Sequence, residues 1–207
     1  MLFEILFSQD IETPIEYERT YLTMQDGGTI SIDWAHLESN NHVLIQPSLE
    51  PASPPSAKRV CFIFPGLSGG SDRGYVKSLV KTLLSDGFEV AIFHNRGVSN
   101  TPYTSLRFAN LTSNEEVERA LDFVKEKAGP GAELCGIGMS MGANVMMRTA
   151  GIQGRDFPLK AIVAVNNPFD LVLAINLMRG SPYEKHLAKD LVKQQITRTE
   201  HGGMNAQ

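Results

Sequence analysis

The sequence predicts an α/β fold, with an open, mostly parallel sheet made of an N-terminal hairpin and four parallel strands. Two observations lead to this fold. Four short, wholly apolar runs follow Arg59, and amphipathic runs at helical spacing separate them. Strands and helices that alternate in this order, joined by right-handed crossovers, build an open sheet. Because such sheets bind ligands at the carboxyl ends of their strands, we expect the functional residues directly after those ends.

The hairpin is predicted near the start of the chain. Residues 17–24 and 29–35 are rich in β-branched and aromatic side chains, and Asp26-Gly27-Gly28 between them suits the positive φ values of a tight reversal. Residues 37–58 then contain several Pro, Ser and Asn, a composition that sustains neither a helix nor a central strand. We expect this stretch to be a surface excursion within one domain.

The remaining elements alternate along the chain. Strands buried on both faces are predicted at 60–64, 90–93, 134–137 and 161–165. Apolar residues at helical spacing over 76–84 predict a helix that Gly87 ends. Ser113-Asn114-Glu115-Glu116 has the form of a capping box at the start of a second helix. A third helix is expected to begin at 140–144 and to end near Gly151.

Composition excludes several classes of function. With 207 residues, 42% hydrophobic and 20% charged, the chain is long enough for one sizeable core, which excludes disorder over most of its length. Nineteen basic against 23 acidic residues give a net charge of −4 without a dense basic cluster, so nucleic acid is not expected as a partner. The sequence contains neither an HExxH nor a P-loop pattern, and no metal or cofactor is predicted.

Cysteine usage and hydropathy bear on location. Cys61 and Cys135 are the only cysteines, which favours a reducing compartment and predicts a cytoplasmic protein. The uncharged apolar stretches are shorter than the about 20 residues of a membrane span. The apolar segment 1–7 is interrupted by Glu4 and lacks the marks of a signal peptide. We interpret it as amphipathic, lying on the domain or loosely on a membrane surface, which leaves peripheral membrane contact open.

The pattern Gly138-Met139-Ser140-Met141-Gly142 supplies the candidate nucleophile. It is a GxSxG sequence with an apolar strand before it and a helix after it. A strand that turns into a helix over so few residues forces the middle residue into a strained conformation, and the flanking glycines remove side chains that would collide. Ser140 would then project its hydroxyl above the sheet, with the Met141 amide free to donate to an oxyanion. The alternative is merely a tight turn.

A second oxyanion donor is expected in the loop after the first parallel strand. This loop reads Pro65-Gly66-Leu67-Ser68-Gly69-Gly70-Ser71. Gly66 lets the backbone pass close to a substrate, which makes the Leu67 amide the natural donor. Two alternatives are a compact turn and a dinucleotide-binding loop. The second is weaker, because the next strand ends in His94-Asn95-Arg96 where a dinucleotide site needs an acid.

These segments together resemble the α/β-hydrolase fold, and more narrowly the branch of the bacterial YheT-like esterases, the plant embryogenesis-associated proteins and the animal abhydrolase-domain lipases 1 and 3. The matching segments are 33–34, 64–71, 75–76, 93–97, 138–142 and 167–170. The resemblance implies a serine hydrolase that cleaves a short-chain ester, a monoacylglycerol or a phospholipid acyl chain through an acyl-enzyme on Ser140. It also implies substrate contacts at Gly66 and Met139; the four methionines from Met139 to Met147 are expected to line the helix packing and an acyl pocket.

The chain departs from this family in its catalytic base. Family members continue into two further strands, which bear an aspartate and then the histidine that activates the serine. His94 is expected two strand positions from Ser140, about 10 Å away at about 4.8 Å per strand, too far for contact. We expect structural or solvated roles for the other histidines (His36, His42, His186 and His201), and His186 on a cap helix over 183–195 is the least improbable exception. Arg96 is expected to form an ion pair or backbone bonds. Asp170 follows the last strand and could orient a base, but we favour a role as the N-cap of the helix that enters the cap.

The missing strands lead to a second hypothesis. We expect a partial hydrolase core at 17–170 that lacks the last strands, preceded by an N-terminal segment at 1–16 and followed by the start of a helical cap at 171–195 and a polar tail at 196–207. The chain would then be a fragment, a truncated gene model or a splice form whose last strand, 161–165, exposes an apolar edge for association. Such a chain could be catalytically impaired and act as a lipid- or partner-binding module.

Overall fold

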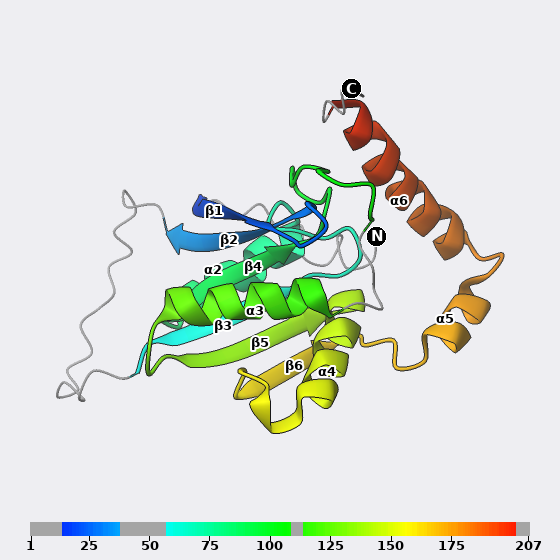
Figure 1. The fold of residues 1–207 in the computed structure, drawn as a ribbon. Helices are drawn as coiled ribbons and strands as arrows, with labels where there is room; N and C mark the ends of the chain where they lie inside the picture. Colours follow the sequence, from blue (N-terminus) through cyan, green and yellow to red (C-terminus); the bar gives the residue numbers. More distant parts are fainter. Residues whose placement is uncertain (1–13, 38–56, 109–113, 202–207) are drawn as a thin grey trace.

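A computed structural model describes residues 14–37, 57–108 and 114–201 of the chain, and its centre is one six-stranded sheet (Figure 1). The order across the sheet is β1-β2-β4-β3-β5-β6. The strands are β1 (Ile15–Thr23), β2 (Thr29–Leu37), β3 (Arg59–Phe64), β4 (Glu89–His94), β5 (Glu133–Met139) and β6 (Ala161–Val165). Strands β4, β3, β5 and β6 are mutually parallel, and β2 joins β4 in antiparallel register. The predicted hairpin, four parallel strands and open sheet are therefore confirmed.

The hairpin follows the turn chemistry of its sequence. Strands β1 and β2 pair antiparallel, with Tyr17 opposite Ala35 and Arg19 opposite Asp33. Gly27 has φ +76° at the reversal, and the Met24 amide donates to the Gly28 carbonyl across it at 2.8 Å. The predicted excursion after the hairpin falls almost wholly on residues 38–56, outside the described residues.

Helices cover both faces of the sheet. They are α2 (Gly74–Ser85), α3 (Glu115–Ala128), α4 (Met141–Gln153), α5 (Leu171–Met178) and α6 (Pro182–His201), with a 3-10 turn at Gly154–Asp156. Alternate residues of β3 point to opposite faces: Phe62 packs in a core cluster with α3 and α4, whereas Ile63 packs in a second cluster with Val76 and Val80 of α2. Two apolar layers thus sandwich the sheet and fix the ends of its strands.

The helix boundaries test two sequence signals. Gly87 has φ +77° just beyond α2, and the Phe88 amide donates to the Leu83 carbonyl at 3.0 Å, which confirms the glycine stop. The predicted capping box is wrong for Asn114 and Glu116, which are among the described residues. Glu116 is 4% exposed and its carboxylate binds Arg96 at 2.6 Å, and the N-cap Asn114 makes no side-chain capping bond. The buried Arg96 guanidinium requires a carboxylate partner, and Glu116 serves as that partner instead of capping the start of α3.

The β6 side of the sheet is the least covered. Strand β6 pairs only with β5 among the described strands, and Val163 is 54% exposed, so the apolar edge is exposed as expected. The prediction that 161–165 is buried on both faces is wrong, because none of its residues is buried within the described part of the chain. Helices α5 and α6 extend away from the sheet in Figure 1, and Phe169 just before α5 is 86% exposed. Helix α6 continues to His201, into the stretch predicted as a polar tail. The other predicted boundaries remain predictions.

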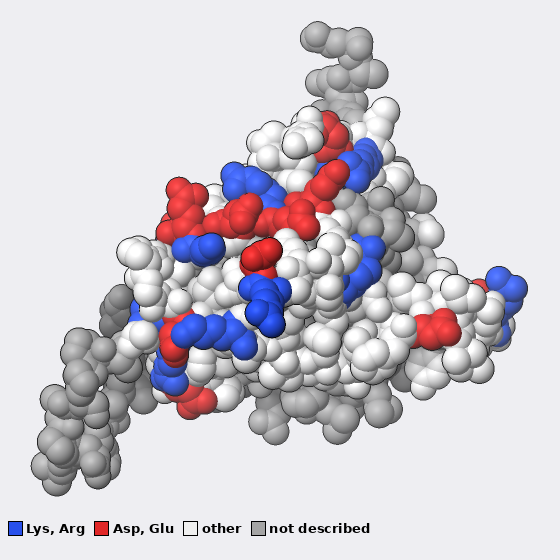
Figure 2. Space-filling view, turned by 60° about the horizontal axis from the view of Figure 1, so that its bottom comes forward, with Lys and Arg blue, Asp and Glu red and all other residues white. Residues whose placement is uncertain are grey.

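Three further observations concern surface charge, helix hydropathy and possible metal ligands within the described residues. Figure 2 shows Lys and Arg side chains scattered among Asp and Glu on one face instead of gathered in one patch. None of the helices described here is long and apolar enough to cross a membrane. Within the same residues, no group of three or more His, Cys, Asp or Glu side chains is placed to hold a metal ion.

Candidate active site

Ser140 occupies the sharp junction between β5 and α4. Its backbone has φ 51° and ψ −117°, a conformation that is strained for a residue with a side chain. The Ser140 amide donates to the Val165 carbonyl of β6 at 2.8 Å, and the Ser140 carbonyl accepts from the Asn144 amide at 3.1 Å, the start of the α4 ladder. The residue is exposed. The chain therefore passes from strand to helix within one residue and lifts this side chain out of the interior.

The two glycines of the pattern make that junction possible. A Cβ on Gly138 would lie 2.5 Å from the Cα of Ala143 in the first turn of α4. A Cβ on Gly142 would overlap the carbonyl oxygens of Phe64 and Pro65 at the end of β3. Both obstacles are main-chain atoms that cannot rotate away, so only glycine permits this close approach of α4 to β5 and β3.

The loop after β3, residues 65–73 (the β3 loop), lies directly against Ser140. A Cβ on Gly66 would be 3.4 Å from both the Ser140 Cβ and the Met139 carbonyl oxygen. The Gly69 amide donates to the Gly66 carbonyl at 2.9 Å, which closes a turn around Leu67. Within the described residues, the Leu67 amide makes no hydrogen bond to the protein. The Met141 amide is the first N–H of α4 and has no acceptor inside the helix. The two predicted oxyanion donors therefore belong to segments that meet at Ser140.

The methionines divide between core and surface. Met139 is 9% exposed and packs in the α2-side core cluster with Ile63 and Val76. Met146 is fully buried in the other cluster, whereas Met147 on α4 is 40% exposed. Packing was thus the correct expectation for Met139 and Met146, and a substrate contact by Met139 remains a prediction.

In the described part of the chain, the hydrogen bonds and ion pairs of His94 and His36 go to residues other than Ser140. His94 is fully buried at the end of β4, two strand positions from β5 as predicted, and its ring bonds to Ser71. His36 on β2 lies 3.8 Å from Glu18, with half of its side chain exposed. His186 is exposed on α6, and His201 is the last residue of that helix. His42 falls outside the described residues.

Comparison with known proteins finds similar chains in several organisms. An embryogenesis-associated protein of Picea glauca is 31% identical over 182 residues, which cover 86% of this chain and 38% of that protein. A phospholipase of Mus musculus, ABHD3, is 27% identical over 148 residues, covering 72% of this chain and 34% of that one. No family model matches. Among solved structures, an esterase of Pyrococcus furiosus superposes with a TM-score of 0.58 at 17% identity, over 86% of this chain and 63% of that one.

The chain belongs to the α/β-hydrolase superfamily. It spans little more than a third of the length of the two curated relatives. The superposition on the Pyrococcus furiosus esterase is evidence of the shared fold alone. The described residues include the sheet, the strand-to-helix junction at Ser140 and the glycine-bearing loop beside it.

Arg96 and Asp170 have the structural roles that the sequence predicts. The Arg96 guanidinium, 1% exposed, binds Asp26 of the hairpin turn and Glu116 of α3, each at 2.6 Å. Its hydrogen bonds hold the pKa of Asp26 far below the usual range, whereas burial raises the pKa of Glu116. Asp170 accepts a hydrogen bond from the Leu173 amide at 2.8 Å as the N-cap of α5. Arg96 joins the hairpin turn to α3, and Asp170 caps α5.

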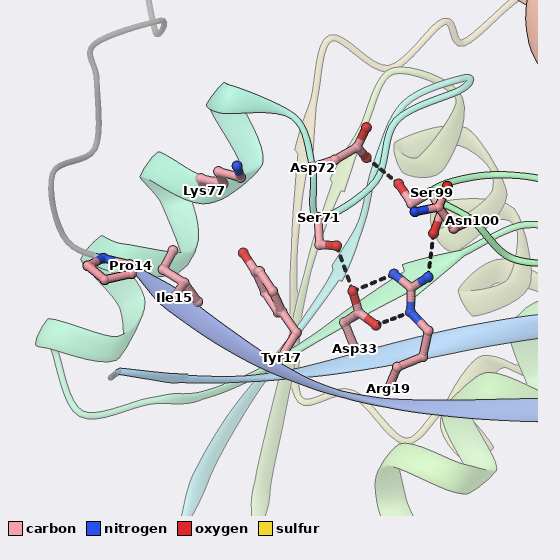
Figure 3. A pocket seen from close by; sticks show the side chains of 10 residues that line it. All are labelled: Pro14, Ile15, Tyr17, Arg19, Asp33, Ser71, Asp72, Lys77, Ser99 and Asn100. Carbon is pink, nitrogen blue, oxygen red and sulfur yellow. Dashed lines mark hydrogen bonds and ion pairs between the residues drawn. The ribbon is translucent and has the colours of Figure 1, made fainter. Parts of the chain in front are cut away.

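A polar cavity of about 600 Å³ lies on the α2 side of the hydrolase sheet, between the hairpin and the β3 loop (Figure 3). Asp33 is buried there, and Arg19 donates two parallel bonds to its carboxylate, at 2.6 and 2.8 Å. The hydroxyl of Tyr17 is buried without a partner in the described residues, and burial raises its pKa. Sequence reasoning missed this cavity. The sequence signal that could have indicated it is the pair Arg19 and Asp33, two opposite charges on strands whose other residues alternate between apolar and polar.

Proposed function

We propose that this chain carries the nucleophile half of an ester-cleaving serine hydrolase, with Ser140 as nucleophile and the amides of Leu67 and Met141 as oxyanion donors. The observation that supports this proposal most strongly is the backbone of Ser140, held at φ 51° with the β3 loop 3.4 Å from its Cβ. Gly66 and Met139 border the approach to the serine. The substrate class is a carboxylic ester with a short or medium acyl chain, a monoacylglycerol or a phospholipid acyl chain.

In this mechanism the Ser140 hydroxyl oxygen attacks the ester carbonyl carbon, and the carbonyl oxygen becomes an oxyanion. The two main-chain amides donate to that oxygen, where charge develops in the transition state. The ester C–O bond then breaks, and the alcohol leaves with the proton that the serine gave up. Water hydrolyses the acyl-serine and restores the hydroxyl. The named relative that acts on lipid esters, the mouse phospholipase, supports this substrate class.

A second candidate function is a binding module without turnover. It is favoured by one observation: in the described residues, no histidine forms a hydrogen bond with the Ser140 hydroxyl. A serine that lacks a base reacts several orders of magnitude more slowly than one in a triad. Such a chain would bind an ester or a lipid at the same edge of the sheet.

Covalent labelling tests the proposal. The purified chain is treated with a fluorophosphonate probe and compared with the Ser140→Ala variant, with Ser85→Ala as a matched control on the exposed end of α2. We expect labelling of the wild type and of the control variant, and loss of labelling in Ser140→Ala. A folded wild type that takes no label contradicts the nucleophile assignment. Ester turnover that disappears in Ser140→Ala would exclude the binding-module alternative.

A further inference from the structure

A buried polar cluster anchors the far end of the β3 loop. The Ser71 amide donates to Nε2 of His94 at 3.0 Å, and the Ser71 hydroxyl donates to Oδ2 of Asp33 at 2.6 Å. All three residues are 5% exposed or less. Hydrogen bonds in such a dry site are stronger than in water, and an unpaired partner is costly. The cluster is therefore a rigid attachment between the loop, β2 and β4.

The hydrogen bonds assign the protonation state of His94. Because Nε2 accepts from an amide, it carries no proton, and the proton of the neutral ring lies on Nδ1, which faces the Ser31 hydroxyl at 3.4 Å. That hydroxyl is 2.7 Å from the Thr101 hydroxyl. Burial holds the pKa of His94 at about 4, against an attraction from Asp33 that raises it. The acceptor for the Ser71 amide is therefore present at neutral pH.

The second member of the cluster is fixed from its other side. Arg19 of β1 holds the Asp33 carboxylate with two bonds and also donates to the Ser99 carbonyl after β4. Figure 3 shows Arg19, Asp33 and Ser71 in one line of contacts that ends at the loop. Because both carboxylate oxygens are occupied, Asp33 holds the Ser71 hydroxyl in one orientation.

The sequence of the loop fits this anchoring. A Cβ on Gly70 would overlap the Ser99 hydroxyl and lie 2.8 Å from the His94 ring, so glycine is required where the loop crosses His94. At its other end, Gly66 lies against Ser140. Leu67 lies between these two fixed points. The position of its amide therefore depends on both ends.

We propose that His94 and Asp33 are positioning residues for the active site: they hold Ser71 so that the β3 loop keeps the Leu67 amide directed at the reaction centre of Ser140. This inference rests on the proposed function for the role of Leu67, but the anchoring itself does not. His94 thus acts two strands away from the serine, as the support of the oxyanion donor and not as a base.

Two measurements on the same variants test it. His94→Leu removes the acceptor, and His94→Gln places an amide oxygen close to the Nε2 position. We expect His94→Leu to exchange the Ser71 amide at least tenfold faster with deuterium, and to lower the maximal rate of phosphonylation of Ser140 at least tenfold at an unchanged half-saturating probe concentration. His94→Gln is expected to restore both quantities to within threefold of wild type. His36→Leu, the same change at an exposed histidine of β2, should alter neither.

The outcomes separate the two proposals. If His94→Leu leaves both quantities within threefold of wild type, or accelerates exchange without lowering the phosphonylation rate, the positioning role is wrong. If the wild type takes no label, the proposed function fails, and the exchange measurement alone decides whether His94 anchors the loop. Should His94→Leu not fold, His94→Asn serves in its place, because its shorter amide reaches the Ser31 side and not the Ser71 amide.

Discussion

Replacement of His94 by Gln should flatten the pH dependence of stability between pH 7.5 and 4.5. The folded chain holds the pKa of His94 at about 4, because burial disfavours the charged ring. In the unfolded chain the same side chain titrates near 6.5. Between these values the unfolded state binds more protons, so stability is complete above pH 6.5 and is lost as the pH falls toward 4.

The magnitude follows from the two pKa values. Each unit of pKa difference corresponds to about 1.4 kcal/mol, which makes the whole contribution about 3 kcal/mol and the part lost by pH 4.5 about 2.5 kcal/mol. The groups that face His94 are Asp33 from β2, Arg19 from β1 and Asp72 from the β3 loop. The pKa of Asp33 is lowered, so its own loss of charge falls below this pH window.

The assay is urea unfolding at both pH values, followed by the fluorescence of Trp34, the only tryptophan and 3% exposed. The wild type should lose about 2.5 kcal/mol more than His94→Gln between pH 7.5 and 4.5. The other titrating groups are common to the two proteins, and Asp33, whose pKa responds to the charge of His94, titrates below this pH window. Parallel losses, equal to within 0.5 kcal/mol or so, would refute a neutral buried His94.

Three further outcomes are expected. Gly142→Ala should lower the free energy of unfolding by roughly 3 kcal/mol or more and abolish labelling, because its Cβ meets main-chain oxygens. Gly151→Ala in the same helix is the control: it has open space around it, so urea unfolding should show no change or a gain in stability of up to about 1 kcal/mol. Arg96→Met should lower the free energy of unfolding by about 3 kcal/mol, because it leaves two carboxylates without their buried partner. Urea unfolding measures this loss, and a loss of less than about 1 kcal/mol would contradict the prediction. The Cys61 thiol beside Cys135 lowers the pKa of Cys135, so Cys61→Ala should move the pH midpoint of Cys135 alkylation upward; an unmoved midpoint would count against the pairing.

The sequence predicts the parts of this fold that depend on local chemistry. Apolar runs, the glycines of the hairpin turn and the stop at Gly87 act within a few residues, and each is found where expected. The junction at Ser140 was predictable for the same reason, because strand, strained serine and helix are contiguous. Contacts between distant residues were not predictable. Glu116 is part of a plausible capping box until Arg96, 20 residues earlier, is brought beside it.

The polar cavity and the His94 cluster belong to that second class. Arg19 and Asp33 are 14 residues apart and meet only because the hairpin register places them opposite one another. Ser71 reaches Asp33 across 38 residues, through the order of strands in the sheet. A single sequence shows an isolated histidine in an apolar strand, and the bond to the Ser71 amide appears only once β4 lies between β2 and β3. The base of a triad would be a long-range contact of the same kind.

Backbone strain is concentrated at the edge of the sheet that carries Ser140. In the part of the chain that the structure describes, five residues other than glycine have positive φ: Ser68, Ser99, Asn100, Ser140 and Asn166. Each lies in the connection that leaves the carboxyl end of a parallel strand, after β3, β4, β5 or β6. Such conformations cost about 1–3 kcal/mol apiece and persist only where the surrounding structure imposes them. Their concentration at one edge supports the proposed site around Ser140. The hydroxyl of Ser140 is exposed at that edge, beside a loop held at both ends.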